Sequence, residues 1–129
     1  MLNIEIISCL NDNYSYLLYN KEANIVAIID PSDFNPCDKI INKKYNKLDY
    51  ILNTHHHFDH IGGNKKLKEK YKSKVLGSEI DKDRIPGIDI ALKEKQNFKI
   101  GNASFEVIFI PGHTKGHIAF YFKNEKIIF

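Results

Sequence analysis

The chain of 129 residues has only two cysteines, Cys9 and Cys37, and they do not form a C-x-x-C pair. A disulfide framework or a dithiol motif would need paired cysteines at characteristic spacings. The simplest interpretation is a pair of reduced thiols in a protein of the cytosol. We therefore expect a cytoplasmic location.

The sequence also lacks long apolar runs. No stretch approaches the roughly 20 apolar residues that a membrane-spanning helix needs. Residues 1–5 do not contain the basic start of a secretory signal. We therefore expect no membrane partner.

A strong charge of either sign is absent too, because the net charge is only +3 and the pI is near 8.7. The lysines concentrate in residues 39–47 and 65–74, where they alternate with hydrophobic residues at helical spacing. This pattern is typical of solvated helix faces. Nucleic-acid binding would require a denser basic patch, so we do not predict a nucleic-acid partner.

The hydrophobic content and the residue patterns of the chain indicate one globular unit. Hydrophobic residues make up 43% of the chain and aromatic residues 12%, which is typical of a packed core. The length allows one domain or a fraction of a larger one. Residue patterns predict strands over 3–7, 14–19, 25–30, 50–52, 75–76, 97–100, 104–110, 118–122 and 127–129. They predict helices over 36–45 and from a cap at Asn64 to Lys72, and a loop-rich segment over 78–93.

The most informative segment is Thr54-His55-His56-His57-Phe58-Asp59-His60, which reads H-x-H-x-D-H. Imidazole and carboxylate are ligands that zinc and similar divalent metals prefer. Five such groups could not all serve one tetrahedral structural site. They can serve two neighbouring ions, His55 and His57 at one, Asp59 and His60 at the other. That arrangement is typical of hydrolysis by a metal-activated water.

The predicted strand over 50–52 leads directly into this cluster. Residues i and i+2 of an extended segment point to the same side, so His55 and His57 can share an ion. His56 points away and would orient its neighbours or pack beneath them. Hydrogen-bonded core histidines and a histidine-rich buffering tract are the alternatives. Neither requires this register after an apolar strand.

A second loop, residues 111–117, carries the sequence PGHTKGH. His113 follows a predicted strand, as the first cluster does. It is therefore a candidate for the third protein ligand of the first metal. His117 would either support the site from outside or lie on the surface.

Together the tracts THHHFDHIGG (54–63) and GHTKGH (112–117) resemble the metallo-β-lactamase superfamily. Within it the chain is most similar to glyoxalase II, the hydroxyacylglutathione hydrolases. The narrower resemblance rests on LNDNY at 10–14, on GGN at 62–64 and on DRIPG at 83–87.

The resemblance implies an α/β (α+β) fold, an αββα sandwich with the site at its edge. It implies hydrolysis of S-(2-hydroxyacyl)glutathione, chiefly S-lactoylglutathione, with two divalent metals. Zinc is the first choice, and iron or manganese is compatible. His55, His57 and His113 match ligands of the first metal, and Asp59 and His60 match part of the second's set. Asp59 would also be catalytic, because it orients the attacking hydroxide.

The resemblance covers this chain but only the first half of the family's catalytic domain. The family's bridging aspartate, a later histidine ligand and a helical region that holds glutathione have no counterpart among residues 1–129. We therefore expect the N-terminal portion of a metallo-β-lactamase-like domain, with an incomplete sandwich that invites self-association. Alone, it should bind at most one metal tightly and hydrolyse little or no thioester.

Three other functions stay open on these residues. A persulfide dioxygenase of the same fold would hold one iron with two histidines and a carboxylate. Lactonases and phosphodiesterases share the same cluster. In a different class, the chain could be a non-catalytic metal-binding or assembly module whose partner supplies the remaining half.

Overall fold

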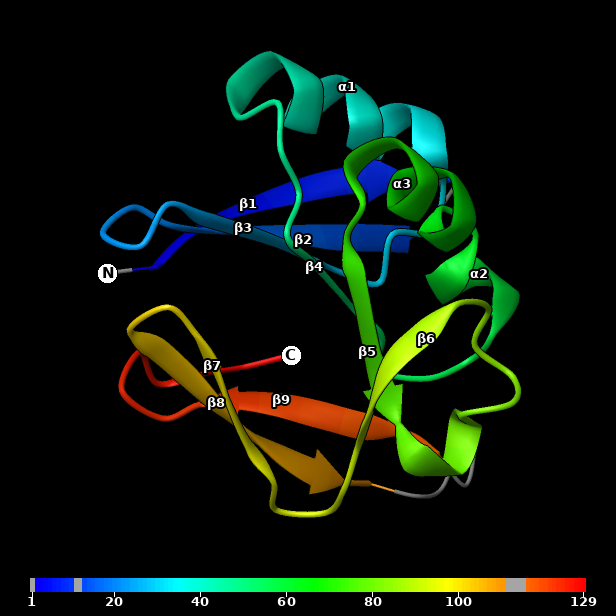
Figure 1. Ribbon diagram of the computed structural model, residues 1–129, viewed down its shortest axis with the longest axis vertical. Helices are drawn as coiled ribbons and strands as arrows, with labels where there is room; N and C mark the ends of the chain where they lie inside the picture. Colours follow the sequence, from blue (N-terminus) through cyan, green and yellow to red (C-terminus); the bar gives the residue numbers. More distant parts are fainter. Residues whose placement is uncertain (1, 11–12, 111–115) are drawn as a thin grey trace.

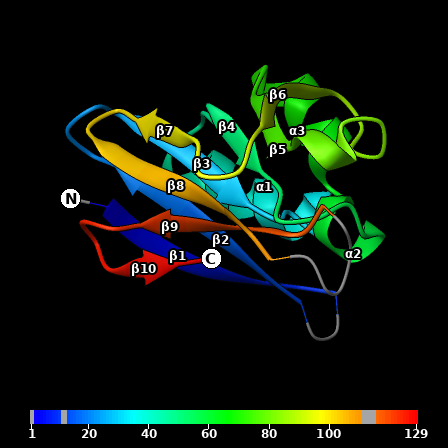
Figure 2. The same cartoon turned by 90° about the horizontal axis from the view of Figure 1, so that it is seen from below.

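A computed structural model describes residues 2–10, 13–110 and 116–129, which form two β-sheets and a group of helices (Figure 1). The first sheet has the strand order β1 (Leu2–Cys9), β2 (Asn13–Asn20), β3 (Ile25–Ile29), β4 (Tyr50–Leu52), β5 (Lys74–Ser78) and β6 (Ile88–Leu92). The second has the order β10 (Ile127–Ile128), β9 (Ile118–Phe122), β8 (Ala103–Phe109) and β7 (Asn97–Ile100), which can be followed in Figure 2. The helices are α1 (Phe34–Lys44), α2 (Phe58–Ile61), α3 (Asn64–Tyr71) and the short 3-10 helix η1 (Glu79–Asp81).

The first sheet changes from antiparallel to parallel at its centre. β1, β2 and β3 form antiparallel pairs, whereas β3, β4, β5 and β6 run parallel to one another. Helices connect β3 to β4 and β4 to β5, as parallel strands require. The last four residues of β3 are all buried, as is typical of a strand that is covered on both faces.

Successive residues of the parallel strands point into two different cores. Ile28 and Ile51 pack toward the helices, with Ile41 of α1 and Leu67 of α3. Their neighbours in the same strands point the opposite way, into the core between the two sheets. That second core includes Ile29, Leu52, Leu76, Phe105, Phe120 and Phe122. Each such side chain stabilises the fold by about 1.5–3 kcal/mol when fully buried.

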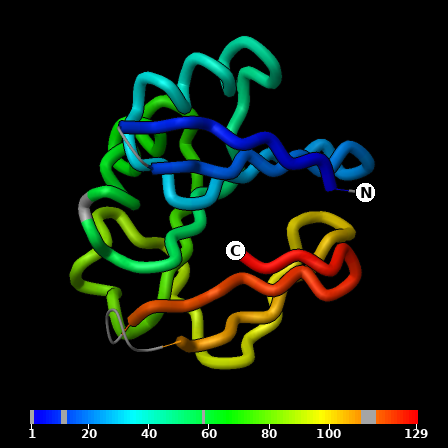
Figure 3. The backbone as a smooth tube through the Cα atoms, turned by 180° about the vertical axis from the view of Figure 1, so that it is seen from behind, coloured from blue at the N-terminus to red at the C-terminus, as the bar shows by residue number. Residues whose placement is uncertain are grey.

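The layers therefore run helices, first sheet, second sheet, as Figure 3 shows from behind. No α-helix of the described residues covers the outer face of the second sheet. This arrangement confirms the predicted α/β (α+β) class and corresponds to three layers of an αββα sandwich. Within the described ranges, no helix is both long enough and apolar enough to pass through a membrane.

Most predicted strands and the helix over 36–45 are confirmed, but the loop-rich assignment of 78–93 is wrong. This segment contains η1 and the strand β6, which pairs in parallel with β5. The pairing register shifts between Val75 and Leu76, and Pro86-Gly87 immediately precedes the strand. Both features interrupt the regular pattern that would have indicated a strand.

The expected start of the second helix is also wrong in two respects. Residues 58–61, which we expected to be loop, form α2, and α3 is capped by Gly63 rather than Asn64. The Asn64 side chain is buried and donates to Asn53 Oδ1 at 2.6 Å instead. A cross-loop amide pair has thus replaced the local cap that the sequence suggested.

The two cysteines are free and buried, and they lie side by side between β1 and α1. Their sulfur atoms are 3.6 Å apart, and Cys9 Sγ lies 3.4 Å from Ser15 Oγ. Burial, together with the adjacent Cys9, raises the pKa of the Cys37 thiol far above its usual range. Cys37 is therefore protonated and unreactive at neutral pH.

Candidate metal centre

The candidate centre lies where the parallel strands end. Asp30 directly follows β3, the histidine cluster follows β4 and η1 follows β5. The Asp30 amide donates to Leu52 O and the Asn53 amide donates to Leu76 O, each at 2.9 Å. These hydrogen bonds extend the pairing of the parallel strands one residue beyond β3 and β4, so the side chains at the carboxyl ends of these strands are held in fixed positions. Open α/β sheets bind their ligands at this edge.

His55 is the centre of the group and is only 4% exposed. Its ring centroid lies 4.0 Å from that of His60, 4.7 Å from that of His117 and 4.9 Å from that of His57. Histidines from both ends of the cluster and from the second loop therefore converge on one point.

Two sets of three side chains bring possible ligand atoms within 4.8 Å of one another: His55, His57 and Asp59, and Asp30, His55 and His60. Imidazole nitrogens and carboxylate oxygens at this spacing are the donors that zinc and related divalent ions take. The residues thus fit a divalent metal ion.

The structure brings together four of the five residues named from the sequence, namely His55, His57, Asp59 and His60. The fifth, His113, lies outside the described residues. The division of these ligands between two ions stays a prediction. His117 is half-buried beside His55.

Sequence reasoning missed Asp30, which organises the cluster. Its carboxylate accepts hydrogen bonds from the Thr54 amide at 2.8 Å and from Thr54 Oγ1 at 2.6 Å, and it lies 3.1 Å from His60 Nδ1. Asp30 adopts φ 52°, a left-handed conformation that aspartate tolerates better than most residues. The available signal was its position at the end of a buried strand, which we had used for the histidines alone.

These hydrogen bonds determine which nitrogen of each histidine carries the proton. The Thr54 hydroxyl donates its single proton to Asp30, so it must accept from His55 Nδ1, which lies 2.9 Å away. The carboxylate likewise accepts from His60 Nδ1, and this bond raises the pKa of His60 despite partial burial. In the neutral form of each ring, Nε2 therefore keeps the lone pair that a metal requires.

Asp59 is held from the opposite side by Asn13, at the start of β2. Asn13 Nδ2 donates to Asp59 Oδ2 at 3.1 Å and to the Asp59 carbonyl at 3.2 Å. The hydrogen bond to the carboxylate lowers the pKa of Asp59, and the nearby His60 acts in the same direction. Asp59 is thus ionised at neutral pH, as a metal ligand must be.

The second sheet joins the centre through β9. The Ile118 amide donates to the Thr54 carbonyl at 2.8 Å, and the Ile110 amide donates to the His117 carbonyl at 2.9 Å. Residues 110, 117 and 118 are therefore held next to the histidine cluster.

Residues 11–129 match the Metallo-beta-lactamase superfamily. The chain belongs to this superfamily. The match includes the histidine cluster, the second loop and Asp30.

Among curated relatives, the chain is 52% identical over 128 residues to a hydroxyacylglutathione hydrolase from Pelagibacter ubique. The match covers 99% of this chain and 54% of the relative. It is 43% identical over 129 residues to a protein of the same name from Methylococcus capsulatus, covering 100% of this chain and 50% of the relative. The chain thus spans about half the length of the curated relatives it matches. The predicted similarity to hydroxyacylglutathione hydrolases is confirmed.

A solved structure supports the fold. A crystal structure of the BLEG-1 B3 metallo-beta-lactamase aligns with a TM-score of 0.84 at 24% identity, covering 99% of this chain and 70% of that one. At this identity the likeness concerns the architecture alone.

Proposed function

We propose that this chain supplies the metal-binding part of a hydrolase for S-(2-hydroxyacyl)glutathione, chiefly S-lactoylglutathione, giving glutathione and a 2-hydroxy acid. The observation that supports it most directly is the hydrogen-bonded group of Asp30, Thr54, His55 and His60, which presents two Nε2 lone pairs beside Asp59. The relatives named hydroxyacylglutathione hydrolase support the choice of substrate.

The cofactor we propose is a pair of divalent metals, zinc before iron or manganese. His55, His57 and His113 would hold the first, and Asp59 and His60 would contribute to the second. When bound, such ions supply Lewis acidity that lowers the pKa of water and polarises a thioester carbonyl.

The chain's own residues would perform the remaining tasks. Asp30 keeps the protons of His55 and His60 on their Nδ1 atoms, directly for His60 and through Thr54 for His55. Asn13 contacts Asp59 at Oδ2, and we assign the other oxygen, Oδ1, to orienting the attacking water. Asp59 is therefore the proposed catalytic residue.

The function is tested by measuring zinc content and S-lactoylglutathione turnover on the gene product as the cell makes it, with residues 1–129 alone measured in parallel. We expect zinc-dependent turnover that His57→Gln abolishes. In the isolated chain we expect one tightly bound zinc ion and little turnover, because the ligands that we propose for the second ion are just two, Asp59 and His60. Turnover of the isolated chain equal to that of the cellular protein would contradict this expectation.

The same samples distinguish the alternatives. Bound iron together with oxygen uptake on glutathione persulfide would identify a dioxygenase. Stoichiometric metal with no turnover in the cellular protein would identify a non-catalytic module.

For location and partners we propose the cytoplasm, a glutathione thioester as the small-molecule partner, and neither nucleic acid nor membrane. We also propose self-association through the second sheet, where Ile110 is 44% exposed and Ile128 is 59% exposed. A sheet face without a covering layer leaves apolar side chains exposed, which promotes association. Gel filtration over a range of concentrations tests this, and a monomer at every concentration would contradict it.

A further inference from the structure

The segment between β5 and β6 contains a buried carboxylate, Asp81, that the proposed chemistry does not use. Its side chain is 0% exposed. Ser78 caps η1 through its hydroxyl, and the Arg84 and Ile85 amides donate to the Asp81 carbonyl at 2.8 and 3.0 Å. Ile85 is 3% exposed and packs in the core beneath the helices. The backbone around Asp81 is therefore tightly held.

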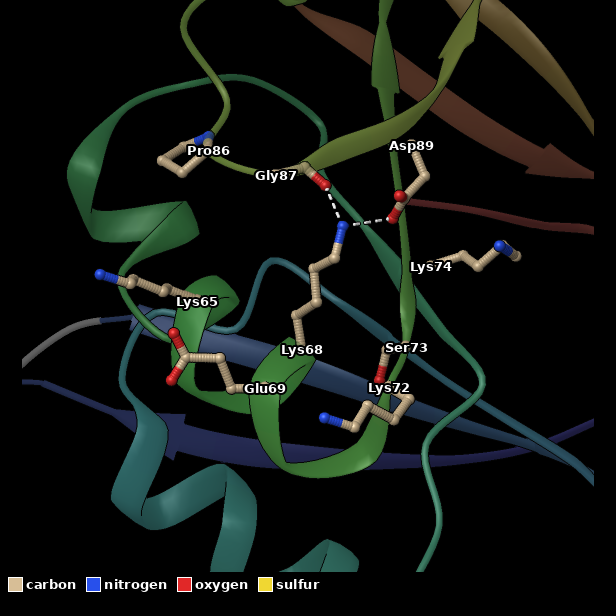
Figure 4. Close-up of a pocket in the computed structure, with 9 residues that line it drawn as sticks. All are labelled: Lys65, Lys68, Glu69, Lys72, Ser73, Lys74, Pro86, Gly87 and Asp89. Carbon is tan, nitrogen blue, oxygen red and sulfur yellow. Dashed lines mark hydrogen bonds and ion pairs between the residues drawn. The ribbon is translucent and has the colours of Figure 1, made fainter.

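The far end of this segment is fastened to α3. Figure 4 shows the Lys68 ammonium between the Gly87 carbonyl and the Asp89 carboxylate, at 2.6 and 2.8 Å. Gly87, the last residue of the DRIPG tract, has φ 70°, a conformation that suits glycine. Both ends of the segment are thus fixed, and Asp81 has a defined position.

The Asp81 carboxylate faces the histidine cluster. Oδ1 lies 3.2 Å from His56 Nδ1, an ion-pair distance without linear hydrogen-bond geometry, and 3.3 Å from Arg84 Nη1. Among the described residues, Oδ2 is buried and has no hydrogen-bond partner. A buried carboxylate costs several kcal/mol unless it is paired, so Arg84 and His56 offset the cost of burying Asp81.

Gly116, next to His117 just before β9, lies directly against the same carboxylate. A Cβ atom added to Gly116 would lie 2.4 Å from Asp81 Oδ1, so only glycine permits this approach. Asp81 therefore touches both loops of the metal centre, the first through His56 and the second at Gly116.

We propose that Asp81 is a positioning residue of the metal centre. By holding the His56 ring, Asp81 fixes the backbone at His56 and therefore the positions of its sequence neighbours, His55 and His57. Contact with Gly116 sets how closely Gly116 and the adjacent His117 approach the cluster. The inference rests on the proposed metal centre but does not depend on which substrate is hydrolysed.

The test is zinc affinity of the whole chain, measured by competition with a chromophoric chelator, for Asp81→Asn, His56→Leu and His56→Asn. Outer groups that orient metal ligands are worth about 10–100-fold in affinity, so we expect a loss of at least tenfold for Asp81→Asn and His56→Leu. His56→Asn should be close to wild type, because its amide can donate from the position of Nδ1. Asp38→Asn is the matched control, since Asp38 is a partly buried carboxylate of α1 that pairs with Lys70 and accepts a hydrogen bond from Tyr71.

Cobalt-substituted samples separate positioning from general stability. A positioning role predicts a changed visible spectrum at metal saturation in Asp81→Asn, whereas lower stability alone would leave the saturated spectrum unchanged. Unchanged affinity and spectrum in both Asp81→Asn and His56→Leu would overturn the inference. So would His56→Asn binding as weakly as His56→Leu. If Asp81→Asn does not fold, the two His56 variants decide. A wild-type chain that binds no zinc or cobalt would overturn the proposed metal centre itself.

Discussion

Replacing Asp30 by asparagine should reverse the proton positions of two histidines. Asparagine has the same shape and tolerates the left-handed backbone at this position, φ 52°. Its oxygen must face the Thr54 amide, which can only donate, so its NH₂ group faces Thr54 Oγ1 and His60 Nδ1. The His60 proton then moves to Nε2.

The same change propagates to His55. Once Thr54 Oγ1 accepts a hydrogen bond from the new amide, its own proton is available to His55 Nδ1, 2.9 Å away. His55 would then also carry its proton on Nε2, the nitrogen needed for the metal. To bind zinc through Nε2, each ring must return its proton to Nδ1, and the hydrogen bond at Nδ1 or at the Thr54 hydroxyl is then lost. Each lost bond costs about 1–3 kcal/mol. With one bond lost at each of the two histidines, the cost is about 2–6 kcal/mol, so we expect zinc affinity to fall by at least about 30-fold.

Zinc competition titrations measure the affinity, and two-bond ¹H–¹⁵N NMR of the metal-free chain reports the histidine tautomers. Asp49→Asn is the matched control, because Asp49 Oδ2 accepts from the Val26 amide at 2.9 Å at the opposite end of β4. The control should bind zinc like the wild type. Asp30→Asn with unchanged zinc affinity and Nδ1-protonated rings would refute the reasoning.

Three further changes have defined outcomes. Asn13→Ala removes the donor that lowers the pKa of Asp59, so NMR titration of this carboxyl should show its pKa rising toward the usual aspartate value. Phe120→Ala empties a position of 0% exposure between the sheets and should lower the free energy of urea unfolding by about 3–5 kcal/mol. Burial opposes ionisation of Asp89, but Lys68 holds its pKa below the usual value; its contribution to stability is therefore complete above about pH 4 and lost as the pH falls further. Acid titration of Asp89→Asn should accordingly show a shallower loss of stability in that range.

The strands β3, β4 and β5 were predictable because they are short apolar runs that need no partner information to be identified, whereas their parallel pairing was not predicted. The hairpin of β2 and β3 and the hairpin of β7 and β8 were predictable from their turns. β6 was not, since its pairing with β5 includes a register shift at Val75 that no local pattern reveals.

The histidines of the site were predictable because residue type and spacing lie within one segment, 54–60. Asp30 and Asp81 were not, since they reach the cluster from the ends of neighbouring strands. Their roles depend on which strand ends share an edge, and only the assembled sheet determines that. Asn13 belongs to the same class, because β2 delivers it to Asp59 from 46 residues away.

The most direct test of the metal centre is the zinc stoichiometry and affinity of the purified chain, compared with those of His55→Gln. Wild type should bind one zinc ion tightly, and His55→Gln should bind at least about tenfold more weakly, because His55 belongs to both sets of converging ligand atoms. Zinc binding that is absent in the wild type, or equally tight in His55→Gln, would contradict the assignment.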